Sequence, residues 1–78
     1  MSKKQIDECV RGSLEDYFKD LHGTEPDGMY EMLVRVVEKP LLEVVMARAE
    51  NNQSRAAQWL GMNRNTLRKK LVEHRLIK

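Results

Sequence analysis

Residues 51–71, NNQSRAAQWLGMNRNTLRKKL, constrain the fold more than any other segment of this 78-residue chain. Two short helical patterns flank Gly61, and the second is polar and basic apart from Leu67 and Leu71. A helix of small residues packed under a second helix with a polar outer face is the arrangement of a helix-turn-helix. The segment therefore predicts a helix-turn-helix over residues 51–74.

The positive charge of the chain is concentrated at its C-terminal end. Residues 48–78 contain eight Lys or Arg and two Glu, a net charge of +6. Residues 1–47 contain six Lys or Arg and ten Asp or Glu, a net charge of −4, so the total of +2 hides the division. A basic surface that coincides with a helix-turn-helix indicates a protein that binds the phosphates of double-stranded DNA.

The rest of the chain has helical periodicity and no alternating, strand-like segment. Apolar residues recur at three- and four-residue intervals over residues 3–22, and Gly23 is expected to close this helix in a left-handed conformation. A second apolar pattern covers residues 28–50 and contains Pro40, whose ring removes a backbone donor. We expect one kinked helix there; the alternative is two helices that meet at Lys39-Pro40.

Local signals also set the ends of the helix-turn-helix. Asn52 is the expected N-cap of its first helix, which runs through Leu60. Gly61 is expected to take the positive φ of the turn, and Asn63 to cap the second helix over roughly residues 64–74.

A chain of this length supplies only about 3–5 kcal/mol of net stability from a single core unless something reinforces it. A single cysteine cannot form an internal disulfide, and Cys9, His22 and His74 do not have zinc-ligand spacing. Association with a second copy of the chain is the remaining way to reinforce the core. We therefore predict an all-α, four-helix subunit, a single domain over residues 1–78, with residues 3–50 forming an intertwined homodimer through the first two helices.

Other functional classes are not supported. The chain has no Ser/His/Asp set, no paired catalytic carboxylates and no glycine-rich phosphate loop, so we expect neither an enzyme nor a cofactor or metal. It has no apolar run that could cross a bilayer and no signal-peptide core, so we expect a cytoplasmic protein without a membrane partner. Cys9 is expected to be half-buried, and the side chains expected on apolar core stripes are Tyr17, Phe18, Tyr30 and Trp59.

Four stretches together have a recognisable pattern: Tyr30-Glu31, residues 38–46 (EKPLLEVVM), residues 52–57 (NQSRAA) and residues 61–71 (GMNRNTLRKKL). With them the chain resembles, over about residues 10–70, the Fis family, the factor for inversion stimulation, a group of small bacterial nucleoid-associated DNA-binding proteins. The resemblance implies a four-helix subunit, an intertwined homodimer, location at the nucleoid, and DNA bending by paired helix-turn-helix units.

Chemistry and motif position together indicate eight candidate DNA-binding residues: Asn52, Ser54, Asn63, Arg64, Thr66, Arg68, Lys69 and Lys70. Arg64 can donate two hydrogen bonds to O6 and N7 of guanine, which is the commonest specific contact in the major groove. Asn63 either caps its helix or contacts a base edge or a phosphate.

The other candidates are read as phosphate contacts. Asn52, Ser54 and the first amides of the third helix are expected to hold one phosphate at the positive helix end. Thr66, Arg68, Lys69 and Lys70 are interpreted as contacts that fix the register on the DNA backbone; Lys69 or Lys70 could instead be a solvated surface charge.

The chain also departs from the family pattern. Because few residues precede the first helix, we do not expect the N-terminal β-hairpin arm with which some members contact a DNA invertase, and so no invertase contact. Val72 and Glu73 interrupt the basic run, and residues 74–78 are partly apolar, which allows this tail to pack on the core. Two other functions stay open: a detached helix-turn-helix effector module of an enhancer-binding transcription activator, and a protein-interaction helical bundle that docks an acidic partner.

Overall fold

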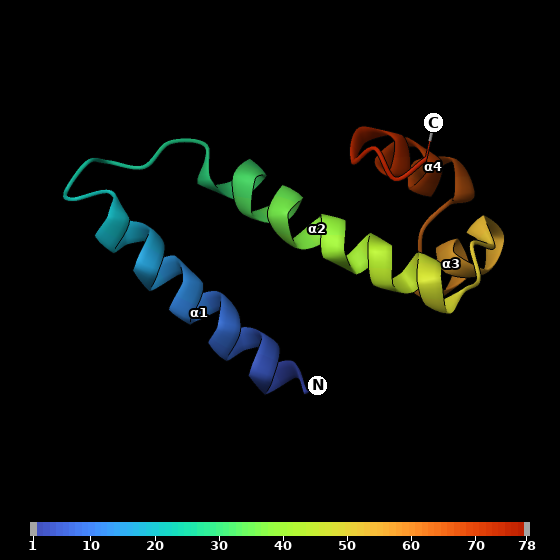
Figure 1. Ribbon diagram of the computed structural model, residues 1–78, viewed down its shortest axis with the longest axis horizontal. Helices are drawn as coiled ribbons and strands as arrows, with labels where there is room; N and C mark the ends of the chain where they lie inside the picture. The colour runs from blue at the N-terminus through green and yellow to red at the C-terminus, as the bar shows by residue number, and fades with distance from the viewer. Residues whose placement is uncertain (1, 78) are drawn as a thin grey trace.

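The computed structural model describes residues 2–77, which form four α-helices and no strand (Figure 1). The helices are α1 (Lys3–Asp20), α2 (Met29–Arg48), α3 (Gln53–Leu60) and α4 (Arg64–Glu73). The predicted all-α, four-helix subunit is confirmed. Lys78, one of the eight basic residues counted above, lies outside the described residues together with Met1.

Helix α1 begins at a capping box that the sequence reasoning did not note. The Ser2 hydroxyl accepts a hydrogen bond from the Gln5 amide at 3.2 Å, and the Gln5 side chain accepts one from the Ser2 amide at 2.7 Å. The helix ends at Asp20, two residues before the expected end. It ends early because His22 already takes a left-handed conformation (φ 51°), next to Gly23 at φ 86°.

Helix α2 continues through Pro40 without interruption, so the alternative of two separate helices is wrong. The N-cap is Gly28, whose left-handed φ of 64° a residue with a Cβ atom rarely adopts. The described helix, Met29–Arg48, is slightly shorter at both ends than the expected span of 28–50.

A Schellman motif ends α2 and sets the direction of α3. Its Glu50 and Asn51 take left-handed conformations in succession, with φ of 55° and 63°. The Asn51 amide donates to the Met46 carbonyl at 2.9 Å, and the Glu50 amide to the Ala47 carbonyl at 3.2 Å. The end of α3 repeats this pattern: the Gly61 amide donates to the Gln58 carbonyl, and the Met62 amide donates to the Ala57 carbonyl. Closed turns rather than flexible linkers therefore connect both ends of α3 to the neighbouring helices.

The core of the subunit lies in its second half, where α3 and α4 pack on the C-terminal part of α2 (Figure 1). Its buried apolar side chains are Leu42, Met46, Ala49, Ala56, Ala57, Leu67 and Leu71. Leu76 and Ile77 pack against this cluster, in agreement with the reading of the tail. Helix α1 contributes no buried residue.

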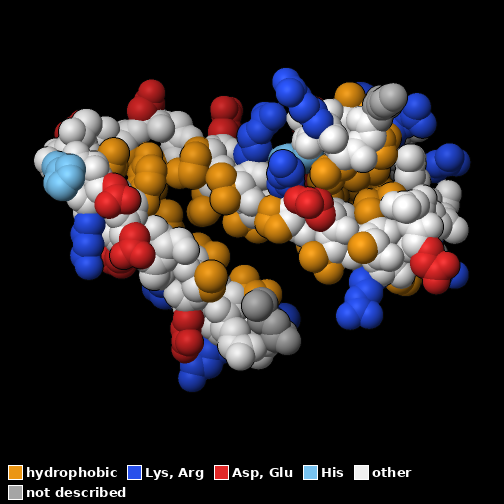
Figure 2. Space-filling view, viewed as in Figure 1, with side chains coloured by type: hydrophobic (Ala, Val, Ile, Leu, Met, Phe, Trp, Pro, Cys, Tyr) orange, Lys and Arg blue, Asp and Glu red, His pale blue; other side chains and the backbone are white. Residues whose placement is uncertain are grey.

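One subunit alone exposes far more surface than a compact chain of its size. Its solvent-accessible surface is 6661 Å², whereas a compact 9.1 kDa monomer exposes roughly 4,900 Å². Its radius of gyration is 15.0 Å, against about 11.5 Å for a globular domain of the same length. Apolar side chains line the sides of α1 and α2 that face each other across the open angle between these helices (Figure 2).

Several apolar residues are therefore less buried than predicted. Trp59 is 56% exposed, which corrects its assignment to the core. The inner face of α3 is occupied by Ala56 and Ala57, and Trp59 is turned about 200° from Ala57 at roughly 100° per residue. Cys9 is exposed rather than half-buried, because α1 has no partner helix within the subunit. Tyr30, on α2, is 82% exposed.

Candidate nucleic-acid interface

The helix-turn-helix is held by the local contacts that its sequence predicted. The Asn52 side-chain oxygen accepts a hydrogen bond from the Arg55 amide at 3.1 Å and caps α3. Gly61 has a φ of 72°, and the Asn63 side-chain oxygen accepts from the Asn65 amide at 2.7 Å and caps α4. Of the two readings of Asn63, the capping role is the one that this geometry confirms.

Helix α4 presents one apolar face to the core and a polar face to solvent. Leu67 and Leu71 are fully buried. At about 100° per residue, Lys69 lies on the opposite side of the helix from Leu67. All of the candidate side chains of the third and fourth helices except that of Lys70 are exposed: Asn52, Ser54, Asn63, Arg64, Thr66, Arg68 and Lys69.

The start of α3 offers backbone donors. The Arg55 amide is already occupied by the Asn52 cap, and the Ala56 amide donates to the Asn52 carbonyl at 3.0 Å. The amides of Gln53 and Ser54 are the remaining first-turn donors, at the end of the helix where the backbone dipole favours an anion.

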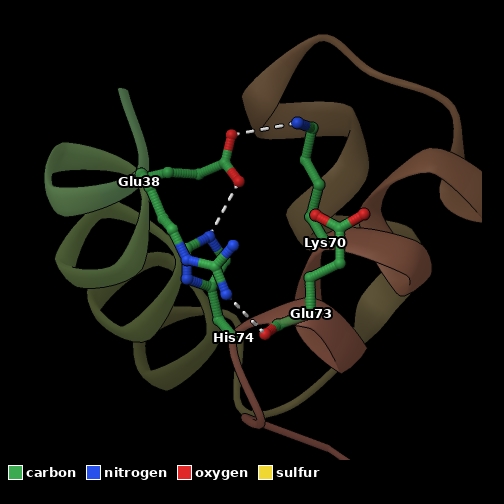
Figure 3. A network of polar contacts seen from close by, with 5 residues as sticks. Glu38, Lys70, Glu73 and His74 are labelled. Atoms are coloured by element: carbon green, nitrogen blue, oxygen red, sulfur yellow. Dashed lines mark hydrogen bonds and ion pairs between the residues drawn. The ribbon is translucent and has the colours of Figure 1, made fainter. Parts of the chain in front are cut away.

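Lys70 differs from the other candidates because its ammonium group is engaged within the subunit. Its Nζ lies 2.9 Å from Oε2 of Glu38 on α2, and its side chain is 31% exposed. The other carboxylate oxygen of Glu38 lies 2.8 Å from Nε2 of His74, whose side chain is 4% exposed. Figure 3 shows the carboxylate between these two groups. No other candidate has a carboxylate within ion-pair distance in the described part of the chain.

The electrostatics of this cluster favour its charged form. The hydrogen bond from Lys70 lowers the pKa of Glu38 from its ordinary value of 4.5; burial opposes this change, and the hydrogen bond from His74 reinforces it. The same contact with Glu38 raises the pKa of Lys70 above its ordinary value of 10.5, against the effect of burial. At neutral pH the pair is therefore a carboxylate and an ammonium ion.

A further contact joins α2 to the end of α4. The Arg35 guanidinium donates to the Glu73 carbonyl at 3.4 Å, a long hydrogen bond to one of the carbonyls that the helix end leaves without an internal partner. Sequence reasoning missed this role of Glu38 and Arg35. The available signal was an acidic residue inside the apolar stripe of α2, four positions before the buried Leu42.

Two other kinds of site are absent from residues 2–77. No group of three or more His, Cys, Asp or Glu side chains lies close enough together to hold a metal ion. None of the four helices combines the length and the apolar character needed to cross a membrane.

Comparison with known proteins places this arrangement in a family. Residues 33–77 match the model of the bacterial regulatory protein, Fis family. A Fis-like DNA-binding protein of Ralstonia nicotianae is 53% identical over 77 residues, which are 99% of this chain and 100% of that protein. A Fis-like DNA-binding protein of Neisseria meningitidis serogroup A is 58% identical over 92% of this chain and 91% of its own length. DNA-binding protein Fis of Proteus mirabilis is 42% identical over 95% of this chain and 76% of its own length. The chain therefore belongs to the Fis family of bacterial regulatory proteins.

Proposed function

We propose that this protein is a homodimeric, nucleoid-associated transcription regulator that binds double-stranded DNA and bends it. The observation that carries the proposal is the face of α4, where exposed polar and basic side chains stand over two fully buried leucines. This is the arrangement of a recognition helix that enters the major groove. The relatives named as DNA-binding proteins support the same conclusion.

The roles of the candidate residues follow from their positions. Arg64, at the first position of α4, donates to the O6 and N7 acceptors of guanine. Asn63 adds a base-edge or phosphate contact through its amide nitrogen, because its oxygen is used by the cap. The other contacts go to phosphates: Asn52 and Ser54 with the first amides of α3, and Thr66, Arg68 and Lys69 from α4. Lys70 is the last of the predicted DNA-binding residues. Its ammonium group is paired with Glu38 in the subunit, so a phosphate contact from Lys70 would require this ion pair to open.

The homodimer is proposed from surface that the single subunit leaves uncovered. The excess over a compact monomer is about 1,800 Å² per subunit, so two copies would bury roughly 3,600 Å², within the range of obligate homodimers. The exposed apolar side chains that the second copy would cover lie on α1 and the first half of α2. Ile6 and Phe18 on α1 are about half exposed, and Val34 and Val37 on α2 are only slightly less exposed. An intertwined pair through these two helices covers both stripes at once.

DNA bending and shape readout follow from the small number of base-reading side chains. Each α4 offers Arg64 and Asn63 for direct reading, which cannot define a long site alone. Two recognition helices in a rigid dimer meet successive major grooves, and a separation below the roughly 34 Å helical repeat requires the duplex to bend and to narrow its central minor groove. Sequences that deform easily at the centre then bind best.

The two alternative functions have less support. In the Ralstonia relative the matched region is the whole protein, which favours a free-standing regulator over an effector module of a larger activator. A bundle that docks an acidic protein partner through α4 would use the same charges, but it gives no reason for sequence preference. Discrimination between DNA sequences therefore separates this alternative from the proposal.

The test compares Arg64→Ala with Arg11→Ala, a matched change of one exposed arginine on α1. Affinities are measured by fluorescence anisotropy for a duplex selected by the wild-type protein from a random pool and for a random duplex. Arg64→Ala should lose about 1–3 kcal/mol on the selected duplex and less on the random one, while Arg11→Ala should bind both as the wild type does. An equal loss of selected and random binding in Arg64→Ala would contradict base reading by this residue. Failure of the wild type to bind any duplex would contradict the function.

A further inference from the structure

The contact between Glu38 and Lys70 separates one basic side chain of α4 from the others, which have no carboxylate partner in the described part of the chain. His74, the C-cap of α4, follows Lys70 by four residues, about one helical turn, and the two oxygens of a single carboxylate hold both side chains. Since a carboxylate oxygen only accepts, the His74 Nε2 that lies 2.8 Å from it must carry a proton. Glu38 is therefore fastened to α4 by two donors at once.

The position of Lys70 on α4 supports its separation from the other basic residues. At about 100° per residue, Lys70 lies only about 60° from the buried Leu67, whereas Lys69 lies on the far side. The ammonium group of Lys70 points to the carboxylate of Glu38 on α2 (Figure 3). Glu73, the nearest acidic residue along α4, adds a further attraction for the same ammonium.

The His74 contact explains why Lys70 would remain with Glu38 when DNA approaches. The His74 side chain is almost fully buried, so it holds the Glu38 carboxylate in place and opposes a rotation of that carboxylate away from α4. If Lys70 left for a phosphate, Glu38, whose side chain is 17% exposed, would keep its charge with only His74 as a partner. Arg64, Arg68 and Lys69 carry no such cost, because no carboxylate holds them in residues 2–77.

We propose, on the basis of the DNA-binding function argued above, that Glu38 is a positioning residue that withholds Lys70 from the DNA backbone. In the complex Lys70 remains an internal ion-pair partner that fixes α4 against α2, and the phosphate contacts of α4 come from its other basic residues. Because phosphate contacts strengthen binding to every sequence alike, withholding one cation lowers the affinity for selected and random duplexes by the same factor and leaves base reading in place. Glu38 thus sets the overall affinity and the salt dependence of binding without changing the base preference.

The test measures the salt dependence of binding to a random duplex between 50 and 200 mM salt. The variants are Lys70→Met, which keeps the aliphatic stem, Glu38→Gln, which keeps the size of the side chain, their combination, and Lys69→Met as the matched control. Circular dichroism selects the variants that are folded. Each phosphate contact contributes about 0.9 to the slope of log affinity against log salt, which is roughly a 3.5-fold change across this range.

A homodimer carries each substitution twice, so Lys69→Met should lower the magnitude of the slope by about 1.8, which is two contacts of about 0.9 each, and Lys70→Met should leave it unchanged. Glu38→Gln should raise the magnitude by about 1.8, because Lys70 becomes available in both subunits, and adding Lys70→Met should remove that gain. Loss of slope in Lys70→Met equal to that in Lys69→Met would overturn the inference, as would an unchanged slope in Glu38→Gln. Either variant alone decides the matter if the other does not fold. Absence of duplex binding by the wild type, or of any effect in Lys69→Met, would instead count against the proposed function.

Discussion

Unfolding of the protein should depend strongly on its concentration. The single subunit exposes 6661 Å², about 1,800 Å² more than a compact chain of this mass, and α1 has no buried residue. If a second copy covers this surface, unfolding also separates the two chains, so the melting temperature must rise with concentration by mass action.

The size of this effect can be estimated. A tenfold rise in concentration adds about 1.4 kcal/mol to the stability of a two-chain unit. A folded unit of two such chains gains roughly 2–4 °C per kcal/mol, which gives about 3–6 °C per tenfold step. Circular dichroism melts over a hundredfold range should therefore differ by about 6–12 °C.

Two valines on α2 provide the variant and its matched control. Val37 lines an apolar hollow of about 300 Å³ with Leu33, Val34 and Leu41, and it is 45% exposed in one subunit. Val36 is 60% exposed, lies outside this hollow and is turned about 100° around the helix. Val37→Asp should abolish both the dimer and the cooperative melt, because the interface would bury an unpaired carboxylate. Val36→Asp should retain both. A melting temperature that does not change with concentration, together with a monomer mass in sedimentation equilibrium, would refute the reasoning.

Three further predictions concern capping, pH and DNA shape. Asn52→Ala should lower the free energy of unfolding by about 1 kcal/mol in urea denaturation, because α3 loses its N-cap; no loss would mean that this cap does not limit stability. The pKa of Glu38 is lower in the folded protein than its ordinary value of 4.5. The ionised Glu38 therefore stabilises the folded state above pH 4.5, and this stabilisation is lost as pH falls through the folded-state pKa. The stability difference between wild type and Glu38→Gln should therefore narrow below pH 4.5, and a constant difference down to strongly acidic pH would contradict the ion pair. Replacing A·T with G·C pairs at the uncontacted centre of a binding site should weaken binding and reduce the gel-measured bend, while inosine–cytosine pairs should restore both; unchanged affinity and bend would exclude shape readout.

The parts of the fold that the sequence predicts well depend on contacts within a few residues. Asn52, Gly61 and Asn63 act on atoms at most five positions away, so their types alone locate the ends of α3 and α4. The apolar period of α2 likewise continues across Pro40, which correctly favoured one helix over two.

The parts that could not be predicted depend on segments far apart in the chain. The sequence treats Lys69 and Lys70 as neighbouring cations, and only the position of α2 distinguishes them, because Glu38 is 32 residues from Lys70. His74 reaches the same carboxylate across 36 residues. Trp59 shows another limit, since an apolar period marks a residue that can be buried but does not identify the face that a neighbouring helix covers.

The closed turn between α2 and α3 also bears on the mechanics of the proposed complex. Glu50 and Asn51 occupy a narrow region of backbone conformations, and their amides are tied to the last turn of α2, so this joint has little torsional freedom. A flexible linker would let each recognition helix rotate until it fitted straight DNA. Here the duplex is the softer component, since bending a site by 40–90° costs on the order of 1–6 kcal/mol. The elastic strain of binding is therefore expected to be stored in the DNA, whose local stiffness then sets the energy of the fit.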